Sequence, residues 1–389
     1  HNFAKYVSQF IQGYMVGVPL KTSYPDEAID EQLREINRLN DADEHNSELV
    51  LHQSIYGRAY ELLYRNEQDE TRFVALDPKE VFVIYDDTVE MNPIAAVRYF
   101  SNQFNDDTLQ VYLYTENMIY EYTTKDEHSY KLKKEKESAH HFDGVPIIEY
   151  ANNQFRQGDY EDVLNLIDLY DSAQSDTANY MTDLNDAYLV IQGNVDLDVE
   201  TAEKMKEARL ILLQTEPGVE GRASQADAKY IYKQYDVSGT EAYKDRLAED
   251  IHKFTNTPNL NDEHFSGTQS GESMKYKLFG LEQVRAIKER MFKKSLRNRY
   301  RLINNILTTA SEGSFNVNDI QIVFTPNLPK SLKEEVDMFN ALGGQLSEET
   351  KLSLLSIIEN PQEELEKIEA ENRLNRPIYD FEQVQEEEV

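Results

Sequence analysis

The spacing of apolar residues changes along the chain, and these changes restrict the fold more than any other feature. In residues 1–57, apolar side chains recur at helical spacing, as Phe3, Val7, Phe10 and Tyr14 do. In residues 58–152, short runs rich in β-forming residues are separated by turn-forming residues. Helical spacing then returns. The pattern therefore predicts an α+β chain containing an antiparallel meander, not regularly alternating strands and helices.

The first 152 residues divide into two expected groups of elements. The helices end or begin at turn and capping residues, with Gly57 expected as a C-terminal cap. The expected helices are Phe3 to Gly17, Asp26–Asn40 and Asp43–Tyr56. The expected strands are Tyr60–Arg65, Val81–Tyr85, Ala95–Phe100, Gln110–Tyr114, Ile119–Thr123, Tyr130–Lys133 and Val145–Tyr150.

The remaining residues alternate between long helices and short mixed segments. Asp159 is expected to cap a helix at 159–185, and the stripe Leu278, Leu281, Val284, Ile287 and Met291 is expected to face the core from a long helix at 274–307. The other expected helices are Glu200–Glu207, 239–254, Ser331–Leu342 and Ser347–Asn360, and the other expected strands are Tyr188–Gln192, Leu210–Gln214, Lys229–Gln234 and Ile320–Phe324. A break at Thr255–Ser273 precedes the long helix, and an acidic tail follows from Gln362.

The formal net charge of −32 argues against tight binding of nucleic acid, which requires a basic surface. Solubility and a surface that avoids DNA both explain this charge, and composition does not choose between them. One segment differs, since Lys275–Arg301 holds ten basic residues and two acidic ones. We interpret it as a charged helix face that meets an acidic neighbour, which in an oligomer can be the next subunit.

Composition also limits the type of site. The chain has no cysteine, which excludes disulfides and thiolate metal sites, and no apolar run approaches the ~20 residues that cross a bilayer. Because the sequence starts at His1 rather than Met, we expect it to be part of a longer chain.

Three motifs have partial similarity to chemical sites. Gly267–Ser273 lacks the Gly-Lys-Ser/Thr of a nucleotide loop, because Glu272 follows Gly271. Asn194–Glu200 has the alternating oxygens of a calcium loop but lacks its glycine. His140 and His141 have no third ligand nearby. The sequence therefore predicts no catalytic residue, no cofactor and no metal site.

Several stretches, in this order, resemble portal proteins of long-tailed bacteriophages that infect Gram-positive bacteria. Together they are more specific than any one of them alone. The stretches are Tyr6–Pro19, Ser54–Tyr64 with Leu76–Glu80, Gly144–Asn153 leading to Asp159 and Asp168, Ser266–Lys275, and Ile322–Pro329.

The resemblance implies a portal fold with an α/β wing, a two-helix stem, a small α/β clip, a long tunnel helix and a helical crown. Implied boundaries are 1–158 and 308–330 for the wing, 159–185 and 239–255 for the stem helices, 186–238 for the clip, 256–273 for a tunnel loop, 274–307 for the tunnel helix and 331–389 for the crown and tail.

The resemblance also implies a function, which is a non-enzymatic ring of about twelve copies at one capsid vertex of the virion. Double-stranded DNA would pass through it, and a terminase ATPase, a head–tail connector and capsid or scaffold proteins would bind it, after assembly in the host cytoplasm and without a membrane. The tunnel loop would line the channel with His264, Phe265, Ser266, Gly267, Thr268 and Gln269, and Lys288, Arg290, Lys293 and Arg297 would form a subunit interface. An acidic metal-dependent nucleic-acid-processing enzyme and a monomeric binding module remain as alternatives.

Overall fold

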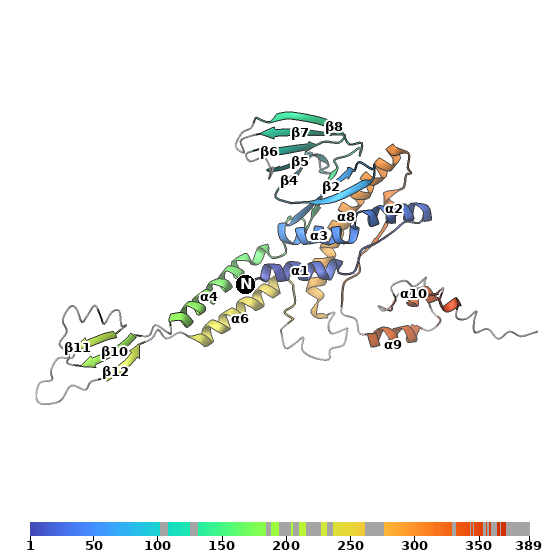
Figure 1. The fold of residues 1–389 in the computed structure, drawn as a ribbon. Helices are drawn as coiled ribbons and strands as arrows, with labels where there is room; N and C mark the ends of the chain where they lie inside the picture. Colours follow the sequence, from blue (N-terminus) through green and yellow to red (C-terminus); the bar gives the residue numbers. More distant parts are fainter. Residues whose placement is uncertain are drawn as a thin grey trace, which may run out of the picture. The chain divides into compact units, whose positions relative to one another are not determined.

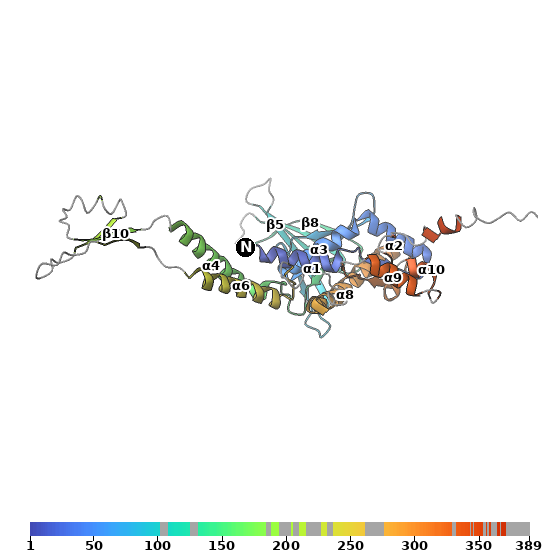
Figure 2. The same ribbon diagram turned by 90° about the horizontal axis from the view of Figure 1, so that it is seen from below.

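The computed structural model has two compact units, His1–Ser266 with Leu278–Pro326, and Gly267–Lys277 with Asn327–Val389 (Figures 1 and 2). It describes residues 1–101, 108–124, 131–183, 188–193, 204, 210–214, 227–231, 236–260, 276–328, 332–342, 344, 346–352, 355, 358, 364–365 and 367–370.

Three helices open the chain, as predicted. Asp26 caps the second by accepting hydrogen bonds from the backbone N–H groups of Ala28 and Ile29. Gly57 ends the third with φ 75°, and a Cβ there would lie 2.0 Å from the carbonyl oxygen of Arg156, so only glycine fits. The helices are α1 (Phe3–Val16), α2 (Glu27–Leu39) and α3 (Ala42–Tyr56).

The β region forms two antiparallel sheets, so the prediction of one meander is wrong in part. A three-stranded sheet has the order β3-β2-β9, and a five-stranded meander has the order β4 to β8. Strand β3 was not predicted. The strands of the first sheet are β2 (Arg58–Arg65), β3 (Thr71–Leu76) and β9 (Ile147–Ala151). Those of the second are β4 (Val81–Tyr85), β5 (Pro93–Ser101), β6 (Leu109–Tyr114), β7 (Met118–Thr124) and β8 (Lys133–Ala139).

The predicted strand Tyr130–Lys133 is wrong in position, because β8 begins at Lys133. Its sequence, KKEKESA, has no apolar alternation, since β8 is an exposed edge strand paired only with β7 among the described strands. Charged residues, especially lysine, are common on such edges because they discourage pairing with other chains. An apolar pattern therefore could not locate this strand.

Two long helices lie antiparallel, and the residues between them in the sequence form a small sheet. Strand β10 pairs in parallel with β11 and antiparallel with β12. Ile251 and Leu247 of the second helix are buried, and the two helices contact each other. Ala173 and Thr177 of the first helix are buried as well. The elements are the 3-10 helix η1 (Glu161–Val163), α4 (Leu164–Asp183), β10 (Tyr188–Gly193), β11 (Leu210–Gln214), β12 (Asp227–Ile231) and α6 (Val237–Phe254). The helix predicted at Glu200–Glu207 lies outside the described residues except for Lys204.

The long helix α8 (Phe279–Ala310) occupies the centre of the first unit, where α1 and β9 contact it and a side-chain hydrogen bond joins it to α3. The 3-10 helix η4 (Val317–Asp319) follows, and β13 (Gln321–Val323) pairs with β1 (Lys21–Ser23), a strand that was not predicted. The second unit includes α9 (Leu332–Leu342) and α10 (Glu348–Leu352).

The main core joins residues far apart in the sequence. Phe292, Leu296 and Ile303 of α8 are fully buried against the helices and the first sheet. The predicted apolar stripe of this helix is wrong in part, because Ile287 is 49% exposed while the basic residues Lys288 and Arg299 are buried. The buried face of α8 therefore differs from the predicted one and includes charged residues, which have partners inside the chain.

Candidate functional site

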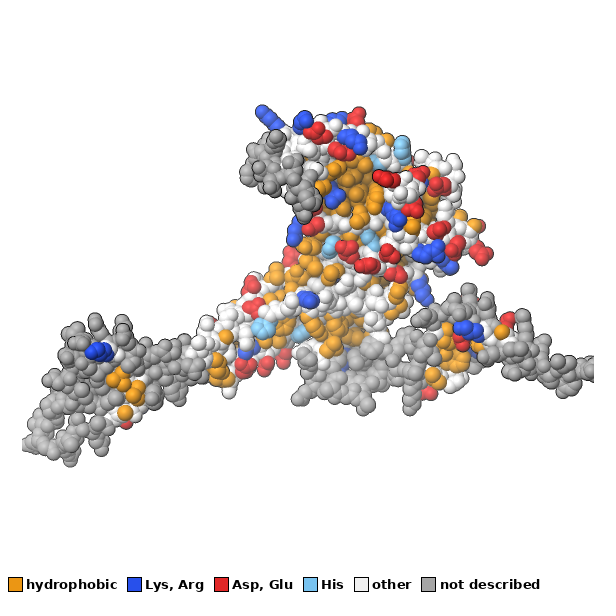
Figure 3. Space-filling model, viewed as in Figure 1, with side chains coloured by type: hydrophobic (Ala, Val, Ile, Leu, Met, Phe, Trp, Pro, Cys, Tyr) orange, Lys and Arg blue, Asp and Glu red, His pale blue; other side chains and the backbone are white. Residues whose placement is uncertain are grey.

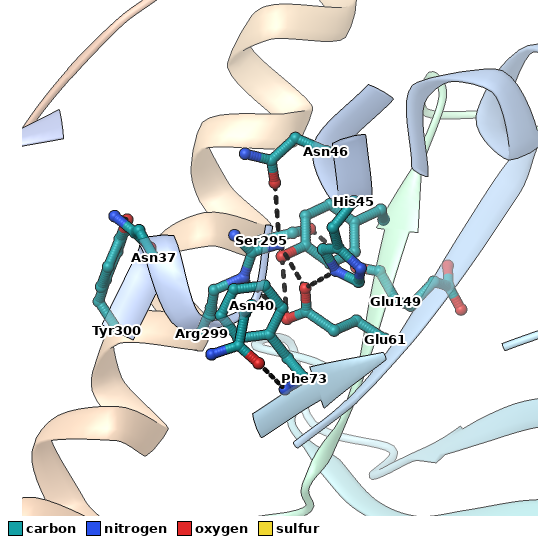
Figure 4. Close-up of polar contacts among 11 residues, drawn as sticks. Asn37, Asn40, His45, Asn46, Glu61, Phe73, Glu149, Ser295, Arg299 and Tyr300 are labelled. Carbon is teal, nitrogen blue, oxygen red and sulfur yellow. Dashed lines mark hydrogen bonds and ion pairs between the residues drawn. The ribbon is translucent and has the colours of Figure 1, made fainter. Parts of the chain in front are cut away.

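The buried face of α8 carries a polar cluster of five residues from four elements (Figure 4). Arg299 donates hydrogen bonds from Nε and Nη2 to the carboxylate of Glu61 on β2, and from Nη2 to Asn46 Oδ1 on α3 at 3.0 Å. His45 Nε2 lies 2.7 Å from Glu61 Oε2, and Tyr150 donates its hydroxyl to Glu61 Oε1 at 3.2 Å. The cluster thus ties α8 to both α3 and the first sheet.

The cluster is closed to solvent, with Glu61 0% and Arg299 1% exposed. Burial alone would raise the pKa of Glu61, but the charge of Arg299 and the hydrogen bonds from His45 and Arg299 lower that pKa to about 2. The guanidinium also lies 4.4 Å from the ring centre of Phe73. A buried ion pair of this kind fixes one arrangement of helix and sheet, because separating its partners leaves a charge without compensation.

A second buried ion pair connects α8 to the residues that precede η1. Lys288 Nζ donates to Asp159 Oδ2 at 2.6 Å, and both side chains are at most 6% exposed. Asn152 Nδ2 donates to the other carboxylate oxygen of Asp159. The prediction that Asp159 caps the following helix is therefore wrong, since its carboxylate binds Lys288 and Asn152 instead.

The start of α8 is attached to α1 and to the end of α6. Tyr14 on α1 donates its hydroxyl to Glu282 Oε2 at 2.9 Å, and Tyr6 donates to the carbonyl oxygen of Pro258 at 2.6 Å. A Cβ on Gly280 would lie 2.7 Å from Asn256 Oδ1, so these two positions are in close contact. The segments that precede and follow residues 261–275 are thus in contact with each other.

The predicted channel residues, His264 to Gln269, lie outside the described residues. The same is true of the loop Gly267–Ser273 and of the segment Asn194–Glu200. Their roles stay predictions.

The four predicted interface residues have two kinds of environment. Lys288 bonds to Asp159, and Lys293 bonds to Glu289 on its own helix and lies over the ring of Phe324. Arg290 and Arg297 are exposed. An interface role stays a prediction for all four.

Sequence reasoning missed two further exposed residues on the same face, Lys294 and Arg301. Positions 290, 294, 297 and 301 have the spacing i, i+4, i+7 and i+11, which places them on one side of a helix. We call Arg290, Lys294, Arg297 and Arg301 the basic stripe. Among the described residues no ion pair is recorded for any of its members. The helical spacing of charges could have identified this stripe from the sequence.

The two adjacent histidines have ordinary structural environments. His140 Nε2 lies 2.9 Å from the carbonyl oxygen of Thr115, and burial lowers its pKa. His141 is exposed. In the part of the chain that the structure describes, no group of three or more histidines and carboxylates could hold a metal ion, and none of the helices has the length and hydropathy that crossing a bilayer requires.

Comparisons with known proteins agree over nearly the whole sequence. Residues 1–377 match the family model described as phage portal protein, SPP1 Gp6-like. The chain is 26% identical over 377 residues to the portal protein of Bacillus phage SPP1, covering 92% of this chain and 73% of that protein. It is 24% identical over 277 residues to the portal protein of Clostridium phage phiCD119, covering 69% of this chain and 59% of that protein.

A solved structure described as the neck of a native GTA particle, computed with C12 symmetry, aligns with a TM-score of 0.46 and 15% identity over 91% of this chain and 90% of that one. The family match confirms the resemblance that the sequence motifs indicated. The chain belongs to the SPP1 Gp6-like family of phage portal proteins.

Proposed function

We propose that about twelve copies of this chain form a ring at one vertex of the capsid, through which double-stranded DNA enters during packaging and leaves during ejection. The observation that carries the proposal is the portal family match over residues 1–377. Proteins of this family are structural components of the capsid and not enzymes.

In this proposal each segment of the fold forms one part of the portal. Residues 1–158 and 308–330 form the wing, and residues 331–389 form the crown. Residues 159–185 and 239–255 form the stem, which is supported by the antiparallel contact of α4 with α6. Residues 186–238 form the clip, which is supported by the separate sheet of β10, β11 and β12. The clip binds the terminase ATPase and later the head–tail connector. The capsid or scaffold proteins contact the assembly, which forms in the host cytoplasm.

The acidity of the chain suits a channel that does not hold DNA. About twelve copies at −32 each bring roughly 380 formal negative charges to the ring. Acidic walls repel phosphates, so DNA sliding through them meets no strong binding sites. The work of packaging then comes from the separate ATPase.

The tunnel loop, 256–273, forms the narrowest part of the channel in this proposal. Its support is the fixed base described above, where Asn256 contacts Gly280 and Tyr6 bonds to Pro258. In this proposal the loop presents His264 and Phe265 to DNA. The long helix, 274–307, carries the loop because its buried ion pairs hold it in place.

The test replaces His264 and Phe265 together with alanine in the phage. Native mass spectrometry should show rings of unchanged copy number, while the amount of packaged or retained DNA falls. A matched control replaces His140 and His141 with alanine, which should leave DNA content unchanged. Normal DNA filling in the loop variant would contradict the channel role of the loop.

A further inference from the structure

The basic stripe of α8 points away from α3. Arg299 faces α3, because its Nη2 donates to Asn46 Oδ1 at 3.0 Å. Two positions along a helix turn the side-chain direction by about 200°. Arg297 and Arg301 stand two positions on either side of Arg299 and are exposed. They therefore lie on the opposite side of α8 from α3.

The same reasoning places an acidic row on the far side of α3. Asn46 faces α8, and Glu44 and Glu48 stand two positions on either side of it, both exposed. Asp41, which directly precedes α3, is also exposed. We call Asp41, Glu44 and Glu48 the acidic stripe, and Figure 3 shows acidic side chains gathered over α3. Within the described part of the chain, Glu48 of this stripe lies 4.0 Å from His52.

The two stripes thus face outward from opposite sides of two helices, α3 and α8, that contribute to one core and are joined by the Arg299–Asn46 hydrogen bond. The segment around the acidic stripe, Asp26–Glu48, holds nine acidic residues and two basic ones. A ring closes by head-to-tail contacts, in which one side of a subunit meets the opposite side of the next. Opposite charges on opposite sides of a subunit are the arrangement that such a contact needs.

We propose that the basic stripe on α8 of one copy lies against the acidic stripe on α3 of the next copy. The inference rests on the proposed ring and names the surfaces that meet in it. It moves the interface from the predicted Lys288 and Lys293, which have partners in their own chain, to Arg290, Lys294, Arg297 and Arg301.

The surroundings of the basic stripe favour a protein partner over nucleic acid. Lys294 and Arg301 line a cavity of about 400 Å³ beside α8. Apolar side chains, among them Val89 and Met91, line it too, together with Glu90 and the ion pair of Arg156 with Glu149. Val89 and Met91 are exposed, and a protein surface can bury such side chains, whereas a phosphate backbone gains nothing from them. Side chains of an acidic protein surface would fit both features.

The test uses two variants that reverse one stripe each. The first is Arg297→Glu with Arg301→Glu, and the second is Glu44→Lys with Glu48→Lys. Each alone brings like charges together at every contact, so we expect each to lose rings and to run as single chains in native mass spectrometry. An equal mixture should form rings again, because each variant then meets its complement on both sides. A control, Lys134→Glu with Lys136→Glu on β8, makes the same charge change as the first variant and should leave rings intact.

The outcomes separate this inference from the function on which it rests. Rings from either single variant, or no rings from the mixture of two folded variants, would overturn the pairing while leaving the ring itself standing. Unfolding measured by circular dichroism shows whether each variant is folded. Rings that persist in the first variant but bind less duplex DNA would assign the stripe to nucleic acid and reject the inference. Wild-type chain that forms no rings would contradict the proposed function, and the pairing with it.

Discussion

The packing around α8 differs from that of the helix pair α4–α6 in how charge and apolar surface are used. Around α8, aromatic and aliphatic residues from helices and a sheet surround two buried ion pairs. Between α4 and α6, burial is confined to one side of each helix, and the ion pair Arg246–Asp250 joins neighbouring turns of one exposed helix face. The α8 region therefore has the larger core, whereas the helix pair buries only a narrow strip of side chains.

The largest expected effect comes from opening the buried cluster. Arg299→Met leaves Glu61 buried without its main partner, and removing one member of a buried ion pair costs about 3–5 kcal/mol. Urea unfolding of the single chain should show this loss. Arg297→Met, two positions away on the exposed face, is the matched control and should change stability by less than about 0.5 kcal/mol. Equal losses in both variants would remove the distinction between the two faces of α8.

Acid should weaken the α8 region through Glu61. The pKa of Glu61 in the folded protein, about 2, is lower than the ordinary value of 4.5. Its contribution to the free energy of unfolding is therefore complete above about pH 4.5 and is lost as the pH falls toward 2. The loss amounts to about 3 kcal/mol. Glu61→Gln cannot titrate, so its stability should fall less steeply over this range than that of the wild type. The same acid dependence in both proteins, measured by urea unfolding at several pH values, would contradict this role of Glu61.

A smaller effect is expected in the helix pair. Ile251→Val removes one methyl group from a fully buried position and should cost about 0.5–1.5 kcal/mol. Because the pair has little core, we expect faster amide exchange in α4 and α6 and unchanged exchange in α8. Uniformly faster exchange throughout would show that the two regions unfold as one.

The smallest effect is expected at the surface of the same pair. Arg246→Ala removes an exposed ion pair with Asp250 and should cost about 0.2–1 kcal/mol. Because salt screens such pairs, the difference from wild type should shrink in concentrated salt. A loss comparable to that of Arg299→Met, measured by urea unfolding, would mean that exposed and buried pairs are alike in this chain.

Local patterns predicted much of the secondary structure. Helical spacing identified α1, α2 and α3, and Gly57 marked the end of α3 because only glycine fits its turn. Short runs rich in β-forming residues identified β4 at its observed bounds and β6 to within one residue. These signals work because capping and one-sided burial depend on neighbouring residues.

The division into two sheets and the partners of the buried charges could not be predicted. Strand β2 is buried along most of its length and pairs with β9, and no local pattern shows which strands pair. Glu61 and Arg299 are 238 residues apart, and Lys288 and Asp159 are 129 apart. The sequence predicted a charged helix with an acidic neighbour. For Arg299 and Lys288 those neighbours are carboxylates of the same chain, and the exposed basic stripe is the part that we propose meets another copy.

The central claim is that identical copies close around an open axis. Electron microscopy of the purified protein, with native mass spectrometry of the same sample, tests it most directly. The account predicts rings of about twelve chains with a bore wide enough for duplex DNA. Single chains of 45.2 kDa, or a solid assembly without a bore, would contradict it.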